Sequence, residues 1–198
     1  MGIIKSGVKL RIKDYPFLDD QTREYVDYII QNSLRANPIL RVGRKKVKPK
    51  QMDFWKLSWS DIILLRVYVG DKDIKAVNEL VYGTSEKDFL KLQLLNSSAC
   101  YKWVVDQLNH IAEIEKQELG DSVNNDLKEA GIDRLNEFGY SATLDELAKG
   151  NLLIYDQWLE LPYMKIFRKL CLNKVKGEIQ KNHNEIVSRK TKRVNRRF

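Results

Sequence analysis

The sequence predicts a mainly α-helical fold, in which a compact multi-helix domain carries a partly extended, potentially β, basic N-terminal arm and a basic C-terminal tail. Two observations lead to this prediction. Apolar residues recur every three or four positions through most of residues 51–187, which is helical spacing. Period-two alternation, the pattern of a half-buried strand, occurs instead in the first 13 residues. With 198 residues and 43% apolar side chains, the chain is long enough for one domain with a substantial core.

Charge divides the chain into three segments. Residues 1–50, the arm with one short helix, carry twelve Lys or Arg against five Asp or Glu, a net charge of +7. Residues 51–187, the helical core, carry seventeen against twenty-two, and residues 188–198, the tail, carry six basic side chains and no acid. The basic ends favour contact with a polyanion or an acidic protein surface, while the middle folds on its own. Alternatively, the charged ends only keep the protein soluble.

Several elements are expected in the arm. Residues 1–13 alternate apolar and basic side chains, which predicts a strand or an extended segment. The alternating residues are Val8, Lys9, Leu10, Arg11, Ile12 and Lys13. Residues 19–37 have helical spacing, and Asn37-Pro38 ends this helix because the residue before a proline disfavours the α region. Residues 39–42, ILRV, then fit a short strand, and residues 43–50, GRKKVKPK, fit a basic linker without core residues.

Short helices open the core. Ser58 or Ser60 is the expected N-cap of the first, which ends at Gly70. This helix is apolar on all sides, so a central position is expected for it. A second helix is expected over residues 73–82, and a third begins within residues 84–87.

Two long helices follow. One is predicted over residues 97–119, and the other begins at Pro162 and is expected to fray after Ile186. Between them, glycines separate helix-sized pieces. Thr143 fits the N-cap of one such piece, because Glu146 three residues later completes a capping box.

The sequence offers little for catalysis. It has no glycine-rich phosphate loop, no dinucleotide fingerprint and no zinc-type cysteine spacing. Its two histidines, His110 and His183, are 73 positions apart, which excludes a histidine-rich metal site. Cys100 and Cys171 fall on apolar helical stripes, so buried thiols in a reducing compartment are expected. We therefore predict that the protein is not an enzyme and uses no cofactor or metal, with an unrecognised carboxylate site as the alternative.

The basic side chains of the arm and the tail are the candidate contact residues. They are Lys9, Arg11, Lys13, Arg41, Arg44, Lys45, Lys46, Lys48, Lys50, Arg189, Lys190, Lys192, Arg193, Arg196 and Arg197, with Phe198 available for stacking on a base. One interpretation is sequence-independent binding of DNA or RNA phosphates, which depends strongly on salt. The other is that the arms lie along neighbouring subunits, where the alternating segment adds a strand to a partner.

Three stretches of helical and aromatic sequence carry a family resemblance. They are FWKLSWSDIILLRVYVGDKDIKAVNELVYG, YKWVVDQLNHIAEIEKQEL and YDQWLELPYMKIFRKL, which lie within residues 54–170. Over this range the chain resembles the small helical virion and tail-assembly proteins of tailed bacteriophages, with a Trp-led short helix pair and a late Leu-Pro-Tyr turn into a helix. The resemblance implies a non-enzymatic role in morphogenesis or structure, with no catalytic residues.

These observations give an ordered set of functional hypotheses. The first is a subunit of a large assembly, a homo-oligomer or ring in the neck, tail or capsid interior of a tailed phage, found in the virion or in host cytoplasm during assembly. The second is a stand-alone RNA- or DNA-binding accessory protein, including a ribosome-associated one. The third is an enzyme with a carboxylate site. No run of 18 consecutive apolar residues occurs, so no membrane contact is expected.

Overall fold

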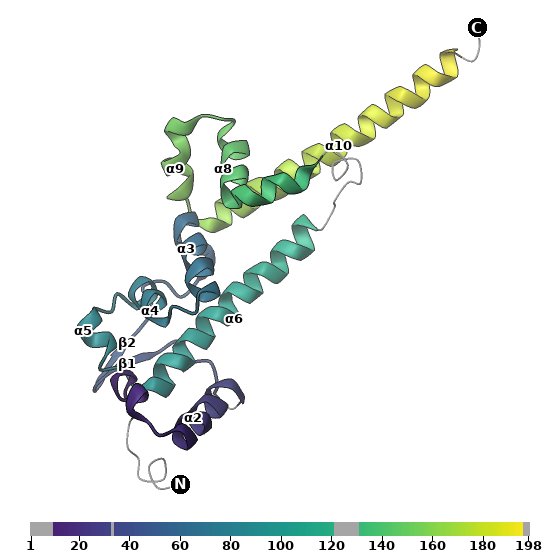
Figure 1. Ribbon diagram of the computed structural model, residues 1–198. Helices are drawn as coiled ribbons and strands as arrows, with labels where there is room; N and C mark the ends of the chain where they lie inside the picture. Colours follow the sequence, from purple (N-terminus) through teal and green to yellow (C-terminus); the bar gives the residue numbers. More distant parts are fainter. Residues whose placement is uncertain (1–9, 33, 121–130, 196–198) are drawn as a thin grey trace. The chain divides into compact units, whose positions relative to one another are not determined.

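The computed structural model describes residues 10–32, 34–120 and 131–195, which are mainly α-helical, as the sequence predicts (Figure 1). The chain divides into two compact units, Met1–Ala112 and Glu113–Phe198. The long helix α6 (Leu94–Leu119) begins in the first unit and ends in the second. Unit 1 also contains a small antiparallel sheet, formed by the strands β1 (Leu40–Val42) and β2 (Lys45–Val47).

Unit 1 begins with a single strand bridge and a 3-10 helix. Arg11 pairs with Gln93 in an isolated antiparallel bridge, and the chain then turns into η1 (Ile12–Phe17). The Asp14 carboxylate accepts a hydrogen bond from the Arg11 N–H at 3.2 Å, which closes the first turn of η1. The predicted extended segment therefore ends at Arg11, and its last two residues are helical instead. The part of that segment before residue 10 lies outside the described residues.

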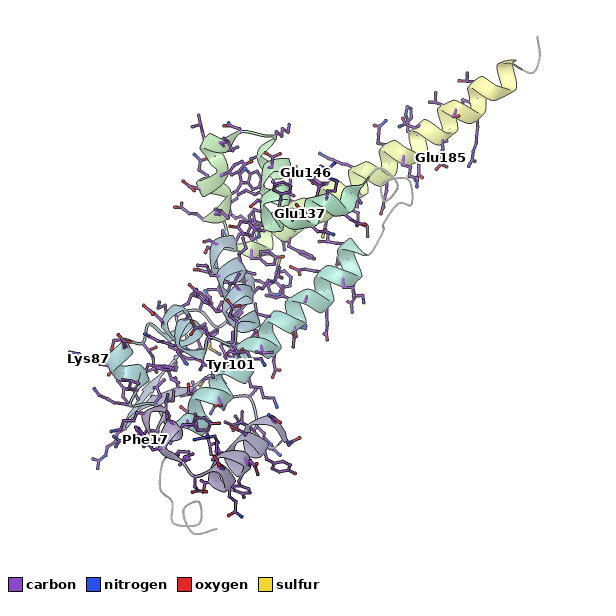
Figure 2. All side chains as sticks on the ribbon, in the orientation of Figure 1. Phe17, Lys87, Tyr101, Glu137, Glu146 and Glu185 are labelled. Carbon is purple, nitrogen blue, oxygen red and sulfur yellow. The ribbon has the colours of Figure 1, made fainter. Side chains whose placement is uncertain are left out.

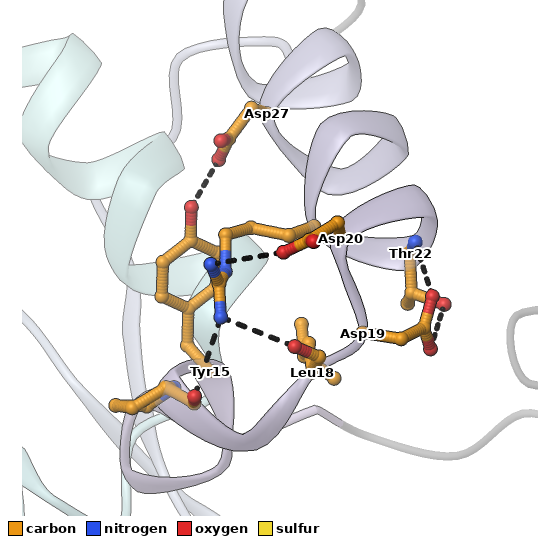
Figure 3. Close-up of polar contacts among 8 residues, drawn as sticks. Tyr15, Leu18, Asp19, Asp20, Thr22 and Asp27 are labelled. Carbon is orange, nitrogen blue, oxygen red and sulfur yellow. Dashed lines mark hydrogen bonds and ion pairs between the residues drawn. The ribbon is translucent and has the colours of Figure 1, made fainter.

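The helix α2 (Asp20–Asn32) is shorter than predicted. Its start is fixed by the Asp19 carboxylate, which accepts hydrogen bonds from the Thr22 N–H at 2.9 Å and the Thr22 hydroxyl at 2.8 Å (Figure 3). The predicted end at Asn37 is wrong for a tertiary reason. The Asn37 N–H donates to the carbonyl of Ala99 in α6 at 3.1 Å, and this contact holds the segment after α2 in a non-helical conformation.

A β-hairpin occupies residues 40–47. The strand predicted in residues 39–42 is present as β1. The prediction of a linker without core residues in 43–50 is wrong, because three of these residues form β2 and Pro49 is buried. The hairpin lies in unit 1 (Figure 1), where Val42 of β1 forms an isolated bridge with Leu92, three residues after the end of α5.

Local capping signals define the short helices of unit 1. These are η2 (Phe54–Lys56), α3 (Trp59–Gly70), α4 (Ile74–Tyr82) and α5 (Glu86–Phe89). The side chains of Ser58, Asp73 and Ser85 cap α3, α4 and α5, each by accepting a hydrogen bond from a backbone N–H in the first turn. Gly83 ends α4 with φ of 67°, the left-handed conformation that glycine adopts without strain. The predicted positions of α3 and α4 and the predicted start of α5 are confirmed.

The helix α3 is buried on one face only. Trp59, Ile62 and Leu65 are buried, whereas Leu64 and Val67 are 41% and 50% exposed. The prediction of a central helix is therefore wrong. In a unit of this size there is too little interior to cover both sides of an apolar helix, so apolar atoms remain on the surface.

The core of unit 1 is centred on α6. Cys100, Val104, Leu108 and Ile111 form its buried stripe, as the helical spacing predicts. The Trp103 ring on the same helix packs edge-to-face against Phe54, with ring centroids 5.3 Å apart. Leu40 of β1, Ile62 and Leu65 of α3 and Val77 of α4 complete the core, each at most 1% exposed.

Unit 2 has a smaller core. In its described residues after α6, the elements are η3 (Ile132–Phe138), α8 (Tyr140–Ala148), η4 (Leu152–Ile154), α9 (Tyr155–Leu159) and α10 (Tyr163–Asn195). The buried apolar residues are Leu144, Leu147, Ala148, Tyr163, Ile166 and Phe167. The end of α6 is tied to α10 by a hydrogen bond between the Tyr163 hydroxyl and Glu115, and by the Lys174 ammonium, which donates to the Glu118 carbonyl at 2.7 Å.

Two boundary predictions in unit 2 are wrong. Thr143 is an interior residue of α8 and not an N-cap, because the helix starts at Tyr140 directly after Gly139. The helix α10 begins after Pro162 as predicted, but it continues past Ile186 to Asn195. Basic side chains near a helix C-terminus interact favourably with the macrodipole, which supports this extension.

Candidate nucleic-acid interface

The hairpin is built around a two-residue turn. Gly43 has φ of +61°, and Arg44 follows it as the second central residue. Glycine at the first central position is typical of the type II′ turn, whose twist matches that of the flanking strands. A Cβ at Gly43 would meet no atom within 4 Å, so the backbone conformation and not the available space favours glycine here.

The turn places two cations directly opposite each other. The register pairs Val42 with Lys45 and Arg41 with Lys46. Side chains of such a directly opposed pair lie on the same face of the hairpin, with Cβ atoms about 5 Å apart. Like charges in this arrangement destabilise the hairpin unless a third, anionic group lies between them.

The basic side chains of residues 41–50 are all exposed. They are Arg41, Arg44, Lys45, Lys46, Lys48 and Lys50, and the segment contains no Asp or Glu. By contrast, Leu40 is fully buried and Val42 and Val47 are half-buried. The hairpin therefore has an apolar side in the core and a cationic side in solvent.

Asn96, near the start of α6, holds β1 in place. Its side-chain carbonyl accepts a hydrogen bond from the Arg41 N–H at 2.6 Å, and its amide donates to the Ile39 carbonyl at 3.0 Å. Val42 also forms an antiparallel bridge with Leu92, which is fully buried. Asn96 could not be singled out from the sequence, because a polar residue in the first turn of a helix has no local signature of a contact 55 positions away.

Lys50 has a structural role at the base of the hairpin. Its N–H donates to the Val81 carbonyl at 2.8 Å, and its ammonium donates to the Glu79 carbonyl at 3.3 Å. Both carbonyls belong to the last turns of α4, where a cation interacts favourably with the helix dipole. Lys50 thus ties the hairpin to α4. Among the other basic residues, Arg41 and Lys46 share the outer face of the hairpin, with Arg44 in the turn and Lys48 directly after β2. Lys45 is exposed but lies opposite Val42, on the other face.

The remaining candidates of the N-terminal segment lie nearby or outside the described residues. Arg11 and Lys13 are exposed. Arg11 bridges to Gln93, whose neighbour Leu92 bridges to β1, so the Arg11 backbone lies on the order of 10 Å from β1, about two strand spacings. Lys9 lies outside the described residues.

Arg23 is a basic residue of the same region whose side chain contacts other residues of the protein. Its guanidinium donates to the carbonyls of Pro16 and Leu18 at 3.3 and 3.1 Å, lies 3.5 Å from the Asp20 carboxylate, and is positioned over the Tyr15 ring (Figure 3). The Tyr15 hydroxyl in turn donates to Asp27 at 2.6 Å, which raises the pKa of Tyr15. This cluster fixes η1 against α2 and is not a candidate for phosphate contact.

The candidates of the C-terminal tail lie in the other unit. Arg189 and Lys190 are exposed residues of α10, and Lys192 and Arg193 belong to the same helix. Arg189 lies 3.5 Å from the Glu185 carboxylate one turn earlier. Arg196, Arg197 and Phe198 lie outside the described residues.

The acidic residues, histidines and cysteines of the described residues were the other candidates for chemistry. Among them, no group of three or more His, Cys, Asp or Glu side chains is placed to hold a metal ion. Burial raises the pKa of the Cys100 thiol to about 11, so this cysteine is a poor nucleophile at neutral pH. Cys171 is half-buried on α10, and partial burial likewise raises its pKa. The prediction of a buried thiol is confirmed for Cys100.

Comparisons with protein-family models, with curated proteins and with solved structures find no match for this chain. The resemblance to tailed-phage proteins therefore stays a prediction. In the part of the chain that the structure describes, no helix combines the length and apolar character needed to cross a membrane.

Proposed function

We propose that the chain is a non-enzymatic nucleic-acid-binding protein whose β1–β2 hairpin contacts the phosphate backbone without reading the base sequence. The observation that carries this proposal is the directly opposed pair Arg41 and Lys46 on the exposed face of an anchored hairpin. Phosphates between these side chains would relieve their repulsion. Two further exposed cations, Arg44 in the turn and Lys48 after β2, extend the same positive surface, so up to about four phosphates would be contacted.

The anchoring supports binding by a preformed surface. The hairpin is anchored to the rest of unit 1 by Leu40, Asn96 and Lys50. Because it is already held in place, little conformational entropy is lost when a ligand binds its outer face. Phosphate contacts of this kind position a nucleic acid but carry no sequence information. The expected behaviour is therefore binding to DNA or RNA of any sequence, with a steep dependence on salt.

The test is fluorescence anisotropy with a labelled duplex of mixed sequence over a salt series. A triple variant, Arg41→Gln, Arg44→Gln and Lys46→Gln, removes three contacts and should lower the slope of log affinity against log salt by about three. The matched control, Lys87→Gln, Lys116→Gln and Lys165→Gln, removes the same charge from exposed positions elsewhere and should keep the slope. Equal losses in the two variants would mean that net charge, and not the hairpin, attracts the nucleic acid.

A subunit of a larger assembly, such as the tailed-phage component that the resemblance implies, is the second candidate. It is favoured by exposed apolar side chains in unit 2. Leu135 and Phe138 of η3 are 52% and 62% exposed, and Leu152 and Leu153 of η4 are 72% and 89% exposed. Leu152 and Leu153 are adjacent in η4, so together they form an exposed apolar surface that is suited to contact another protein.

Analytical ultracentrifugation without nucleic acid tests this second candidate. A discrete species larger than a dimer, lost in the double variant Leu152→Ser and Leu153→Ser, would support assembly through this surface. If neither protein forms such a species, self-assembly by this surface is refuted.

A further inference from the structure

The C-terminal part of α10 carries exposed apolar residues in a heptad pattern. Leu172, Val175, Ile179 and Ile186 are each about half exposed, at 48%, 49%, 61% and 51%. Their spacings of three, four and seven residues fit the a and d positions of a coiled coil. Leu172, Ile179 and Ile186 occupy successive a positions, and Val175, Asn182 and Arg189 occupy successive d positions.

Beyond Lys174, which donates to Glu118, the described residues of unit 2 leave this part of the helix exposed. The buried residues of α10, Tyr163, Ile166 and Phe167, all lie in its first two turns, whereas residues 175–191 are exposed. In proteins, most of the stability of a helix comes from packing of an apolar face and not from helix propensity. A seam with a/d spacing is a suitable face for packing against another helix.

The charged residues beside the seam favour a second copy of the same helix, in parallel orientation, as the partner. The e positions hold Lys176, His183 and Lys190, and the g positions hold Glu178 and Glu185. In a parallel pair, each g residue lies beside the e residue five positions later on the other helix. Glu185 would then face Lys190 of a second copy, and Glu178 would face His183. In an antiparallel pair, g faces g and e faces e, so Glu would face Glu and Lys would face Lys.

We propose that residues 172–190 of α10 pair with the same segment of a second copy as a parallel two-stranded coiled coil. Isoleucine at the a positions 179 and 186 favours two strands. Asn182 at d weakens the seam but restricts the register, since the two copies of Asn182 hydrogen-bond to each other only when they lie side by side. Arg189 at the last d position brings two like charges together and weakens the end of the seam. Arg189 also stays within reach of Glu185, its partner 3.5 Å away in the same helix. This inference does not depend on nucleic-acid binding by the hairpin.

Sedimentation of the full chain over a concentration series tests the dimer, using two adjacent residues as a matched pair. Ile186 lies in the seam and Val187 lies beside it, and the two are exposed to a similar extent, 51% and 47%. Ile186→Glu should shift the protein to monomer at concentrations where the wild type is dimeric. Val187→Glu adds the same charge outside the seam and should leave the dimer intact. A wild type that is monomeric throughout, or equal dissociation of the two variants, would overturn the proposal.

Disulfide trapping tests the parallel orientation. In a parallel dimer, identical a residues are neighbours, so Ile186→Cys in a Cys171→Ser background should form a covalent dimer on mild oxidation. Val187→Cys in the same background should cross-link much less. In an antiparallel dimer, residue 186 would lie opposite the start of the seam, and neither variant would cross-link efficiently. That result would refute the parallel arrangement.

Discussion

The hairpin and the C-terminal part of α10 are both rich in lysine and arginine, yet the chain supports them differently. Three tertiary contacts hold the hairpin: Leu40 in the core, Asn96 on the β1 backbone and Lys50 at the end of α4. Residues 175–191 of α10 are exposed and are held mainly by their own backbone hydrogen bonds, and Figure 2 shows Glu185 on this stretch of the helix. Similar charge patterns in a sequence can therefore belong to a hairpin anchored in the core or to an exposed stretch of helix.

The largest expected difference between the two regions is in the free energy of unfolding that is lost when an apolar side chain is removed. Leu40→Ala empties a fully buried position and should lower the free energy of unfolding by about 2–5 kcal/mol. Val187→Ala removes an exposed side chain from α10 and should change it by less than about 0.5 kcal/mol. Urea denaturation followed by circular dichroism measures both. If Leu40→Ala proved as mild as Val187→Ala, the hairpin would not be part of the core of unit 1.

The same contrast explains which elements could be predicted from the sequence. The starts of α3 and α4 follow from Ser58 and Asp73, because an N-cap acts on the backbone two or three residues away. The hairpin is held by contacts with Asn96 and Leu92, which lie about fifty positions further along the chain. No local pattern in GRKKVKPK predicts these contacts. The cationic residues were identified by composition alone, but their cross-strand register, which makes Arg41 and Lys46 neighbours, required the structure.

The full length of α10 could not be predicted from the local sequence either. A run of basic residues after Ile186 predicts fraying, because like charges repel. In the structure the helix continues, with Arg189 near Glu185 and the Thr191 hydroxyl donating to the Val187 carbonyl at 3.0 Å. The heptad seam is visible in the sequence once the helix is known to extend past Ile186. A helix that ends there leaves too few turns for the pattern to be recognised.

A smaller loss of stability is expected for a substitution at Asn96. Because this substitution changes no charge, it tests whether anchoring of the hairpin contributes to nucleic-acid binding. Asn96→Ala removes two hydrogen bonds to the β1 backbone and should lower the free energy of unfolding by about 1–2 kcal/mol. Nucleic-acid affinity should also fall several-fold, although no charge is lost, because the hairpin is no longer held. Asn184→Ala, the same substitution on the exposed part of α10, is the control and should change neither quantity. Unchanged anisotropy titrations for Asn96→Ala would show that anchoring does not matter for binding.

The smallest expected effect is the change in the free energy of unfolding caused by a substitution at Lys46. The sign of this change distinguishes a ligand-binding role from a structural one. Lys46→Gln removes a cation directly opposite Arg41 while leaving the backbone pairing intact. Relief of the repulsion should raise the free energy of unfolding by about 0.2–1 kcal/mol at low salt, and the gain should shrink as salt screens the charges. Phosphate affinity should fall at the same time. Lys116→Gln, an exposed lysine on α6 outside the hairpin, should give neither the gain nor the loss. Opposite changes in stability and binding at one residue would indicate that its charge is retained for a ligand, whereas parallel losses would mean that Lys46 contributes to the fold of the hairpin.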